Sequence, residues 1–160
     1  MVAEFQECTL GGKPALLPVR ATRGSAGYDF FASEDVVIPS ILKQVLGLLI
    51  GRPIKPKRVY TNVKVKLNPY QTLLVFNRSS NPSRGLVLAN GVGVVDSDYY
   101  GNPNNDGNIG FEFYNLCPWD VTIKRGTRIG QGVITFFSLA HGDELTKGKE
   151  RTGGYGSTGE

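Results

Sequence analysis

Two carboxylates, Asp96 and Asp98, end an apolar segment that reads GVGVVDSDYYGN over residues 91–102. Carboxylates this close can share a proton or bind a cation, so the pair is a candidate for acid–base or metal chemistry. A continuous strand would send both side chains to the same side, whereas a turn that starts at Ser97 would separate them. Two solvated turn residues are an equally good interpretation of this segment taken alone.

A second candidate for chemistry is the segment NRSSNPSRG at residues 77–85, which follows the apolar residues LLVF. Its two arginines offer planar donors for phosphate oxygens, and its serines offer hydroxyl and backbone N–H donors in a turn. We interpret the segment as an anion-binding loop, with an ordinary polar loop between strands as the alternative.

The glycine-rich segment GGYGSTG near the C-terminus is the third candidate. An aromatic residue between glycines suits stacking on a base better than packing in a core. A stacking ring, phosphate donors and a carboxylate together suggest a nucleotide ligand. The segment lacks the strand–helix context of a dinucleotide fingerprint, and no GxxxxGK[ST] occurs, so the two commonest nucleotide-binding folds are not indicated.

The elements that must position these residues fit one domain, since the chain has 160 residues and is 40% hydrophobic. Its 21 glycines and 9 prolines separate short runs rich in Val, Ile, Thr, Tyr and Phe, which predicts an all-β sandwich or jelly roll. The strand candidates are residues 63–67, 71–76, 91–95, 109–114, 122–124 and 132–137. One helix is predicted in SILKQVLGLLI, with Ser40 as the N-cap and an apolar face of Leu42, Val45, Leu46 and Leu49.

Composition argues against several classes of protein. Two distant cysteines and a single histidine, His141, cannot supply a four-ligand zinc site. The formal charge is +4, and we expect the scattered basic residues to be solvated and not to bind nucleic acid; they are Lys55, Lys57, Arg58, Lys64 and Lys66. No apolar run approaches the roughly 18 residues of a membrane helix, and the first residues lack a signal core, so we expect a cytoplasmic protein without membrane contact.

Five segments, in chain order, resemble the five motifs of the homotrimeric deoxyuridine triphosphate nucleotidohydrolases, the dUTPases. They are AGYDFFA, NRSSNPSRG, NGVGVVDSDYYGN, RIGQGVI and RTGGYGSTG, and together they span residues 26–159. The resemblance implies a jelly-roll-like β barrel of the dUTPase (β-clip) type, with a short helical insertion. It also implies a homotrimer with active sites between subunits, a barrel over residues 1–140, and a flexible C-terminal arm at residues 141–160 that closes over a site.

The resemblance further implies that Asp96 is the general base that activates water for attack on the α-phosphorus of dUTP, giving dUMP and pyrophosphate. Such an activity limits uracil in DNA and supplies dUMP. Asn90 would read the uracil edge in a hairpin, and Tyr99 would pack against the deoxyribose. Asp29 would orient water around a Mg²⁺ ion that the three phosphates mainly hold, or would satisfy donors in a turn. The other substrate-binding residues would be Arg78, Ser79, Ser80, Gly93, Gln131, Arg151, Tyr155, Ser157 and Thr158.

Three features leave alternatives open. Glu112, in the strand GFEFYN, lies where the related dCTP deaminases carry their general base, so deamination, alone or with hydrolysis, is the second hypothesis. The segment 39–53 looks like an insertion whose apolar face must be buried on the barrel, in a trimer contact or on a partner protein, so a regulatory binding protein is the third. NPNNDGN after Tyr100 and Gly101 also looks inserted, and lengthens a loop beside the site; Asp98 is expected to be structural.

Overall fold

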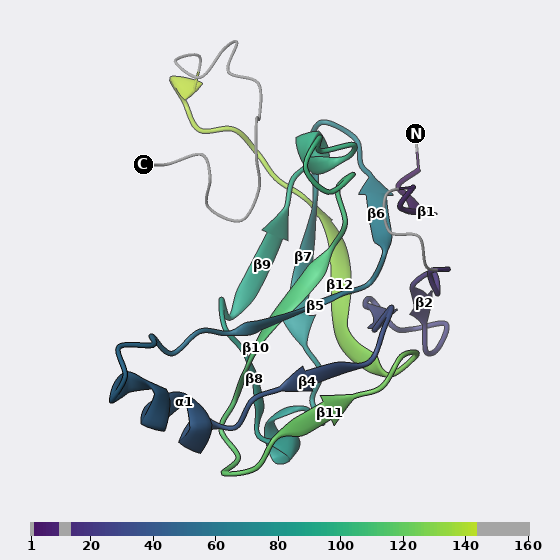
Figure 1. Cartoon of the computed structure of the whole chain (residues 1–160). Coiled ribbons are helices and arrows are strands. Elements are labelled where there is room, and N and C mark those ends of the chain that lie inside the picture. Colours follow the sequence, from purple (N-terminus) through teal and green to yellow (C-terminus); the bar gives the residue numbers. More distant parts are fainter. Residues whose placement is uncertain (1, 10–13, 144–160) are drawn as a thin grey trace.

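The computed structural model describes residues 2–9 and 14–143, and β-strands dominate it (Figure 1). Its strands are β1 Glu4–Glu7, β2 Val19–Arg20, β3 Tyr28–Phe31, β4 Val36–Ile38, β5 Lys57–Tyr60, β6 Val63–Lys66, β7 Gln71–Asn77, β8 Leu86–Leu88, β9 Val92–Val95, β10 Gly110–Asn115, β11 Val121–Ile123 and β12 Arg128–Phe136. The helical elements are α1 Ile41–Leu48 and the short 3₁₀ turns η1 Pro82–Arg84 and η2 Ser97–Tyr99.

The strands form antiparallel ladders in four sheets. The largest has five strands in the order β2-β3-β12-β7-β9, and a second has three strands in the order β5-β10-β8. Two strand pairs, β1-β6 and β4-β11, complete the arrangement. The predicted all-β, jelly-roll-like class is therefore confirmed.

The core lies between the five-stranded and the three-stranded sheets. Phe30 on β3 meets Phe111 on β10 with ring centroids 5.6 Å apart, and Phe111 stacks on Phe113 at 6.4 Å. All three rings are fully buried, and Leu73 on β7 is buried with them. Because β7 alternates, its residues Leu73 and Val75 face this core while Leu74 and Phe76 face outward.

The charged residue Lys64 was wrongly expected to be solvated. Alternation in VKVK predicts that the lysines of β6 point to solvent, yet Lys64 is only 8% exposed. Its ammonium group donates to both carboxylate oxygens of Asp106, at 2.9 and 2.8 Å, so a buried partner replaces water.

Helix α1 begins as predicted, because the Ser40 hydroxyl accepts a hydrogen bond from the N–H of Lys43 at 3.2 Å. The apolar face of α1 does not pack on the barrel of its own chain: Leu42, Val45 and Leu46 are 45–55% exposed and no residue of the helix is buried. Figure 1 shows α1 projecting from the barrel. The helix is far too short to cross a membrane, and no other helix of the described part of the chain is long enough to do so.

Candidate functional site

One group of site residues gathers at an end of the five-stranded sheet. Asp29 on β3 lies directly opposite Gln131 on β12, and Gln131 lies opposite Phe76 on β7, two residues before Arg78. The carboxylate of Asp29 forms ion pairs with Arg128 at 3.2 Å and with Arg78 at 3.7 Å. We call Asp29, Arg78, Arg128 and Gln131 the arginine cluster.

The loop after β7 is built by two asparagines that the sequence analysis did not select. The Asn77 side chain accepts the N–H of Arg78 at 3.0 Å and the amide of Asn81 at 2.6 Å. Asn81 is 2% exposed and also donates to the carbonyl oxygen of Ile129 at 2.8 Å. These bonds fix the loop against β12, which leaves Ser79 and Ser80 exposed next to Arg78.

Arg128 is a further site residue for which the sequence analysis named no role. It precedes Gln131 by three positions, so regular alternation would place the two side chains on opposite faces. A register shift between Arg128 and Gly130 adds one residue to β12 and places Arg128 opposite Phe31, on the same face as Asp29 and Gln131. The cluster therefore has two guanidinium groups around one carboxylate, which suits a polyanion.

A second group of site residues lies on the edge strand β9. Val92 and Val94 are 44% and 60% exposed, so they mark the outer face of the strand. The backbone of Asp96 is still extended, at φ −83° and ψ 161°, and η2 starts at the next residue. Asp96 thus shares the outer face with both valines, and the turn separates it from Asp98, as one of the two sequence interpretations predicted.

Asn90 and Gly93 pack together at the start of β9. A Cβ atom on Gly93 would lie 2.5 Å from a methyl group of Val75 and 3.1 Å from the side-chain nitrogen of Asn90, so no larger residue fits. The expected hairpin is wrong in one respect: β8 pairs with β10 and β9 pairs with β7, so Asn90 lies in a turn between two sheets. The Asn90 side chain is exposed there.

Tyr99 is 6% exposed, so it offers a ligand only a narrow part of its side chain. Its hydroxyl accepts a hydrogen bond from the Asn105 amide at 2.7 Å and donates to the carbonyl oxygen of Asn108 at 3.3 Å. The residues that hold Tyr99 belong to the segment NPNNDGN, which the sequence analysis identified as an inserted loop.

The two groups of site residues do not meet within one chain. Asp29 and Asp96 are separated by three strand spacings across the sheet and by four residues along it. With strands about 4.8 Å apart and a rise of about 3.3 Å per residue, the Cα atoms of the two residues lie about 20 Å apart. Side chains of this length cannot bring both carboxylates to one phosphate group.

Magnesium fits this site only as an ion that a ligand brings with it. The described residues contain no group of three or more His, Cys, Asp or Glu side chains that could hold a metal ion. Asp29 is 14% exposed and already paired with two arginines, so it retains little capacity for direct coordination. Phosphate oxygens with a water bridge to Asp29 would suit Mg²⁺.

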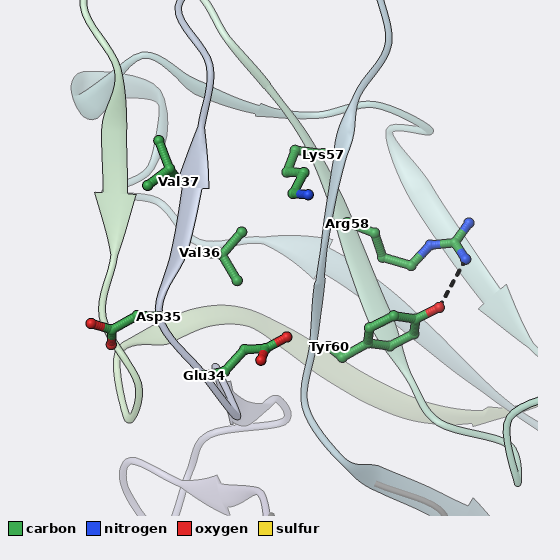
Figure 2. Close-up of a pocket in the computed structure, with 7 residues that line it drawn as sticks. All are labelled: Glu34, Asp35, Val36, Val37, Lys57, Arg58 and Tyr60. Atoms are coloured by element: carbon green, nitrogen blue, oxygen red, sulfur yellow. Dashed lines mark hydrogen bonds between the residues drawn. The ribbon is translucent and has the colours of Figure 1, made fainter.

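Glu112 lies on the three-stranded sheet, where its carbonyl oxygen accepts the N–H of Ala89, the residue before Asn90, at 2.8 Å. It is directly opposite Arg58 on β5 and accepts hydrogen bonds from that guanidinium group at 2.9 and 2.5 Å. Arg58 also donates to the Tyr60 hydroxyl at 3.1 Å and lines an open groove with it (Figure 2). The groove contains none of the residues predicted from the sequence as site residues. It is lined by Glu34, Asp35, Val36, Val37, Lys57, Arg58 and Tyr60.

Four predicted substrate-binding residues, Arg151, Tyr155, Ser157 and Thr158, lie outside the described residues. Their roles in closing over a ligand remain predictions.

Comparison with known proteins gives a consistent result. A family model described as dUTPase matches residues 13–159. The deoxyuridine 5'-triphosphate nucleotidohydrolase of Lactococcus lactis subsp. lactis (strain IL1403) is 41% identical over 144 residues, which cover 89% of this chain and 87% of the relative. The crystal structure of dUTPase from Streptococcus mutans has a TM-score of 0.74 and 38% identity, covering 86% of this chain and 98% of that one. A mutant dUTPase from phage phi11 of S. aureus, described for its coordination of a structural Mg(II) ion, is alike in fold alone, with a TM-score of 0.64, 19% identity and coverage of 88% and 94%.

The fold is that of an all-β protein, and the two guanidinium groups around Asp29 suit a phosphorylated ligand. The family match covers most of the chain, and the Lactococcus relative is similar over nearly its whole length. The chain therefore belongs to the dUTPase family, and it is an enzyme of the dUTP diphosphatase class.

Proposed function

We propose that this protein hydrolyses dUTP to dUMP and pyrophosphate at sites that two or more copies of the chain complete together. The observation that carries the proposal is the placement of the arginine cluster and Asp96 on one outer face of the five-stranded sheet, about 20 Å apart. A homotrimer with sites between subunits explains why each chain holds two separate parts of a site.

An apolar surface lies between the two parts and supports this assembly. The same outer face carries Leu74, Phe76, Val92, Val94 and Val133, of which Val92 and Val94 are 44% and 60% exposed. An apolar face on an edge strand is typical of a surface that another chain covers. A second copy on this face would bring its own Asp96 toward the arginine cluster of the first.

In the proposed reaction Asp96 accepts a proton from water while the water oxygen bonds to the α-phosphorus of dUTP. The bond between that phosphorus and the oxygen of the β-phosphate breaks, and pyrophosphate leaves with the electron pair. Arg78, Ser79 and Gln131 donate hydrogen bonds to phosphate oxygens and stabilise the charge that develops there. Mg²⁺ would supply further neutralisation of charge on the phosphates, and Asp29 would help to hold it through a water molecule.

Recognition of the nucleoside is assigned to the other group. Asn90 hydrogen-bonds the uracil edge at the turn before β9, next to the closely packed Gly93. Tyr99 contacts the deoxyribose and leaves no room for a 2′-hydroxyl. The C-terminal residues complete the site: Arg151, Ser157 and Thr158 bind the terminal phosphate and Tyr155 stacks on the base.

Two alternatives receive less support. The ion pair with Arg58 gives Glu112 a structural role, and its place on another sheet separates it from Asp96 and the arginine cluster. A partner protein at residues 39–53 stays a prediction; the exposed leucines of α1 are compatible with a partner and with a trimer contact. The cytoplasmic location also stays a prediction from the N-terminal sequence.

The test is incubation with dUTP and with dCTP, each with Mg²⁺, followed by separation of the nucleotides, for the wild type, Asp96→Asn and Glu112→Gln. We expect dUMP and pyrophosphate from dUTP alone, with activity abolished only in Asp96→Asn. Conversion of dCTP to a uracil nucleotide that Glu112→Gln stops would instead establish the deaminase.

A further inference from the structure

The 102–108 loop is anchored by a buried ion pair. Asp106 accepts hydrogen bonds from the Lys64 ammonium group at 2.8 and 2.9 Å and from the backbone N–H and hydroxyl of Thr9 at 2.7 and 2.9 Å. The Lys64 and Asp106 side chains are only 10% and 12% exposed. Burial raises the pKa of Asp106, but the hydrogen bonds from Lys64 and Thr9 outweigh it and lower that pKa below its ordinary value. The middle of the loop is thus attached to β6.

The end of the loop has a second anchor. The N–H of Asn62 donates to the Asn108 side chain at 3.0 Å, and the Asn108 amide donates back to the Asn62 side chain at 3.1 Å. Gly107 adopts φ +77°, and a Cβ atom there would lie 2.6 Å from the carbonyl oxygen of Tyr99. The loop therefore packs directly on the backbone of Tyr99 and has no space in which to shift toward it.

Between these anchors the loop holds the phenol group of Tyr99. Asn105 donates to the hydroxyl at 2.7 Å, and the hydroxyl donates to the Asn108 carbonyl oxygen at 3.3 Å. The Asn105 side chain is itself oriented, because its oxygen accepts the N–H of Gly107 at 3.1 Å. The hydroxyl thus accepts one hydrogen bond from this loop and donates another to it, so the ring is held at its far end.

We propose that Asn105 is a positioning residue for sugar selection, which acts by holding Tyr99 against the place of the 2′-hydroxyl. The inference rests on the proposed function, in which Tyr99 contacts the deoxyribose. A side chain excludes the oxygen atom of a 2′-hydroxyl only if it cannot move away by the width of that atom. The Tyr99 ring meets this condition because its hydroxyl is held by the loop. The inserted loop is therefore part of the specificity of the enzyme and not only a surface extension.

The test compares Asn105→Leu with the matched control Asn104→Leu. Leucine keeps the branched arrangement of heavy atoms but removes the donor to Tyr99 and the acceptor for Gly107, whereas the Asn104 side chain is exposed in the same loop. The measurement is kcat/KM for dUTP and for UTP, on variants shown by circular dichroism to be folded. We expect the dUTP-to-UTP ratio to fall about fivefold to tenfold in Asn105→Leu, through a higher KM for dUTP and faster turnover of UTP, and to stay unchanged in the control.

A double-mutant cycle with Tyr99→Phe distinguishes positioning from general loosening. If Asn105 acts through the phenol hydroxyl, Asn105→Leu lowers the ratio no further once that hydroxyl is absent. Additive effects, or an equal loss of activity on both nucleotides, would overturn the inference, as would an unchanged ratio in Asn105→Leu. A wild-type protein that does not hydrolyse dUTP would instead refute the proposed function, and the inference with it.

Discussion

Complementation between inactive variants tests whether two chains complete one site. The perturbation is a pair of substitutions, Arg78→Ala in one chain and Asp96→Asn in the other. Each removes one of two groups that lie about 20 Å apart on the same sheet, so neither chain alone carries both parts. Equal amounts of the two variants are unfolded together, refolded, and assayed for pyrophosphate release from dUTP.

The expected activity follows from counting. A site is intact when the chain that supplies Asp96 is the Arg78→Ala variant and the chain that supplies the arginine cluster is the Asp96→Asn variant. Each condition holds in half of the cases, so about one quarter of the sites are intact after random mixing. Sites that lie within one chain would never be intact, and the mixture would stay as inactive as its components.

A matched control shows whether the recovered activity comes from sites shared by two chains. Wild type mixed with the double variant Arg78→Ala/Asp96→Asn also retains about one quarter of full activity when two chains share a site, but about one half when each chain holds its own. Native mass spectrometry must show mixed oligomers in both experiments. Mixed oligomers without recovered activity would refute the division of the site.

Three further predictions concern stability and reactivity. Lys64→Met leaves Asp106 buried without its partner and should lower the free energy of unfolding by about 3–5 kcal/mol in urea titrations. Because their hydrogen bond lowers the pKa of Asp106 and raises that of Lys64, this loss of stability should be constant from about pH 5 to 9 and shrink below about pH 4, where Asp106 becomes protonated. A loss of stability that does not change in acid would contradict this prediction. Gly93→Ala should lower the free energy of unfolding by about 1–3 kcal/mol, because the new methyl group would clash with Val75. Gly24→Ala, with open space around its Cβ position, should lower it far less, and equal losses of stability in thermal unfolding would be inconsistent with this packing. Burial raises the pKa of the Cys8 thiol to about 11, so iodoacetamide at pH 8 should label Cys117 and leave Cys8 unmodified. Peptide mass mapping measures the labelling of each cysteine, and rapid labelling of Cys8 would contradict the prediction.

Local chemistry made part of the fold predictable from the sequence. The Ser40 cap, the apolar strands β7 and β12 and the turn after Asp96 all follow from neighbouring residues, and all are present. The strands that were not predicted, β1 to β5 and β8, are all short, and β1, β2, β3 and β5 carry charged residues. Their pairing depends on partners far along the chain, as for Glu4 and Lys66 in the β1–β6 ladder.

Non-local contacts also determined what the sequence analysis missed in the candidate site. Lys64 looks solvated by alternation, because its partner Asp106 is 42 residues away in an irregular loop. Arg128 faces Asp29 only because one extra residue in β12 changes the register, and no sequence motif predicts that bulge. The motifs thus predict the reacting groups, whereas the residues that hold those groups in place could be found only from the three-dimensional arrangement.

The arrangement of the two groups of site residues shows what cannot be predicted from the sequence of one chain. Alternation along β9 aligns Val92, Val94 and Asp96, and strand pairing aligns Asp29 with Gln131, yet both rules act within a single sheet. A sheet fixes the distance between its own two ends, so Asp96 cannot approach the arginine cluster of its own chain however the loops move. If two copies complete each site, as proposed, evolution acts on two surfaces together. A substitution on the outer face of β7 or β9 is then expected to alter catalysis by changing how one copy packs on another, without changing a reacting group.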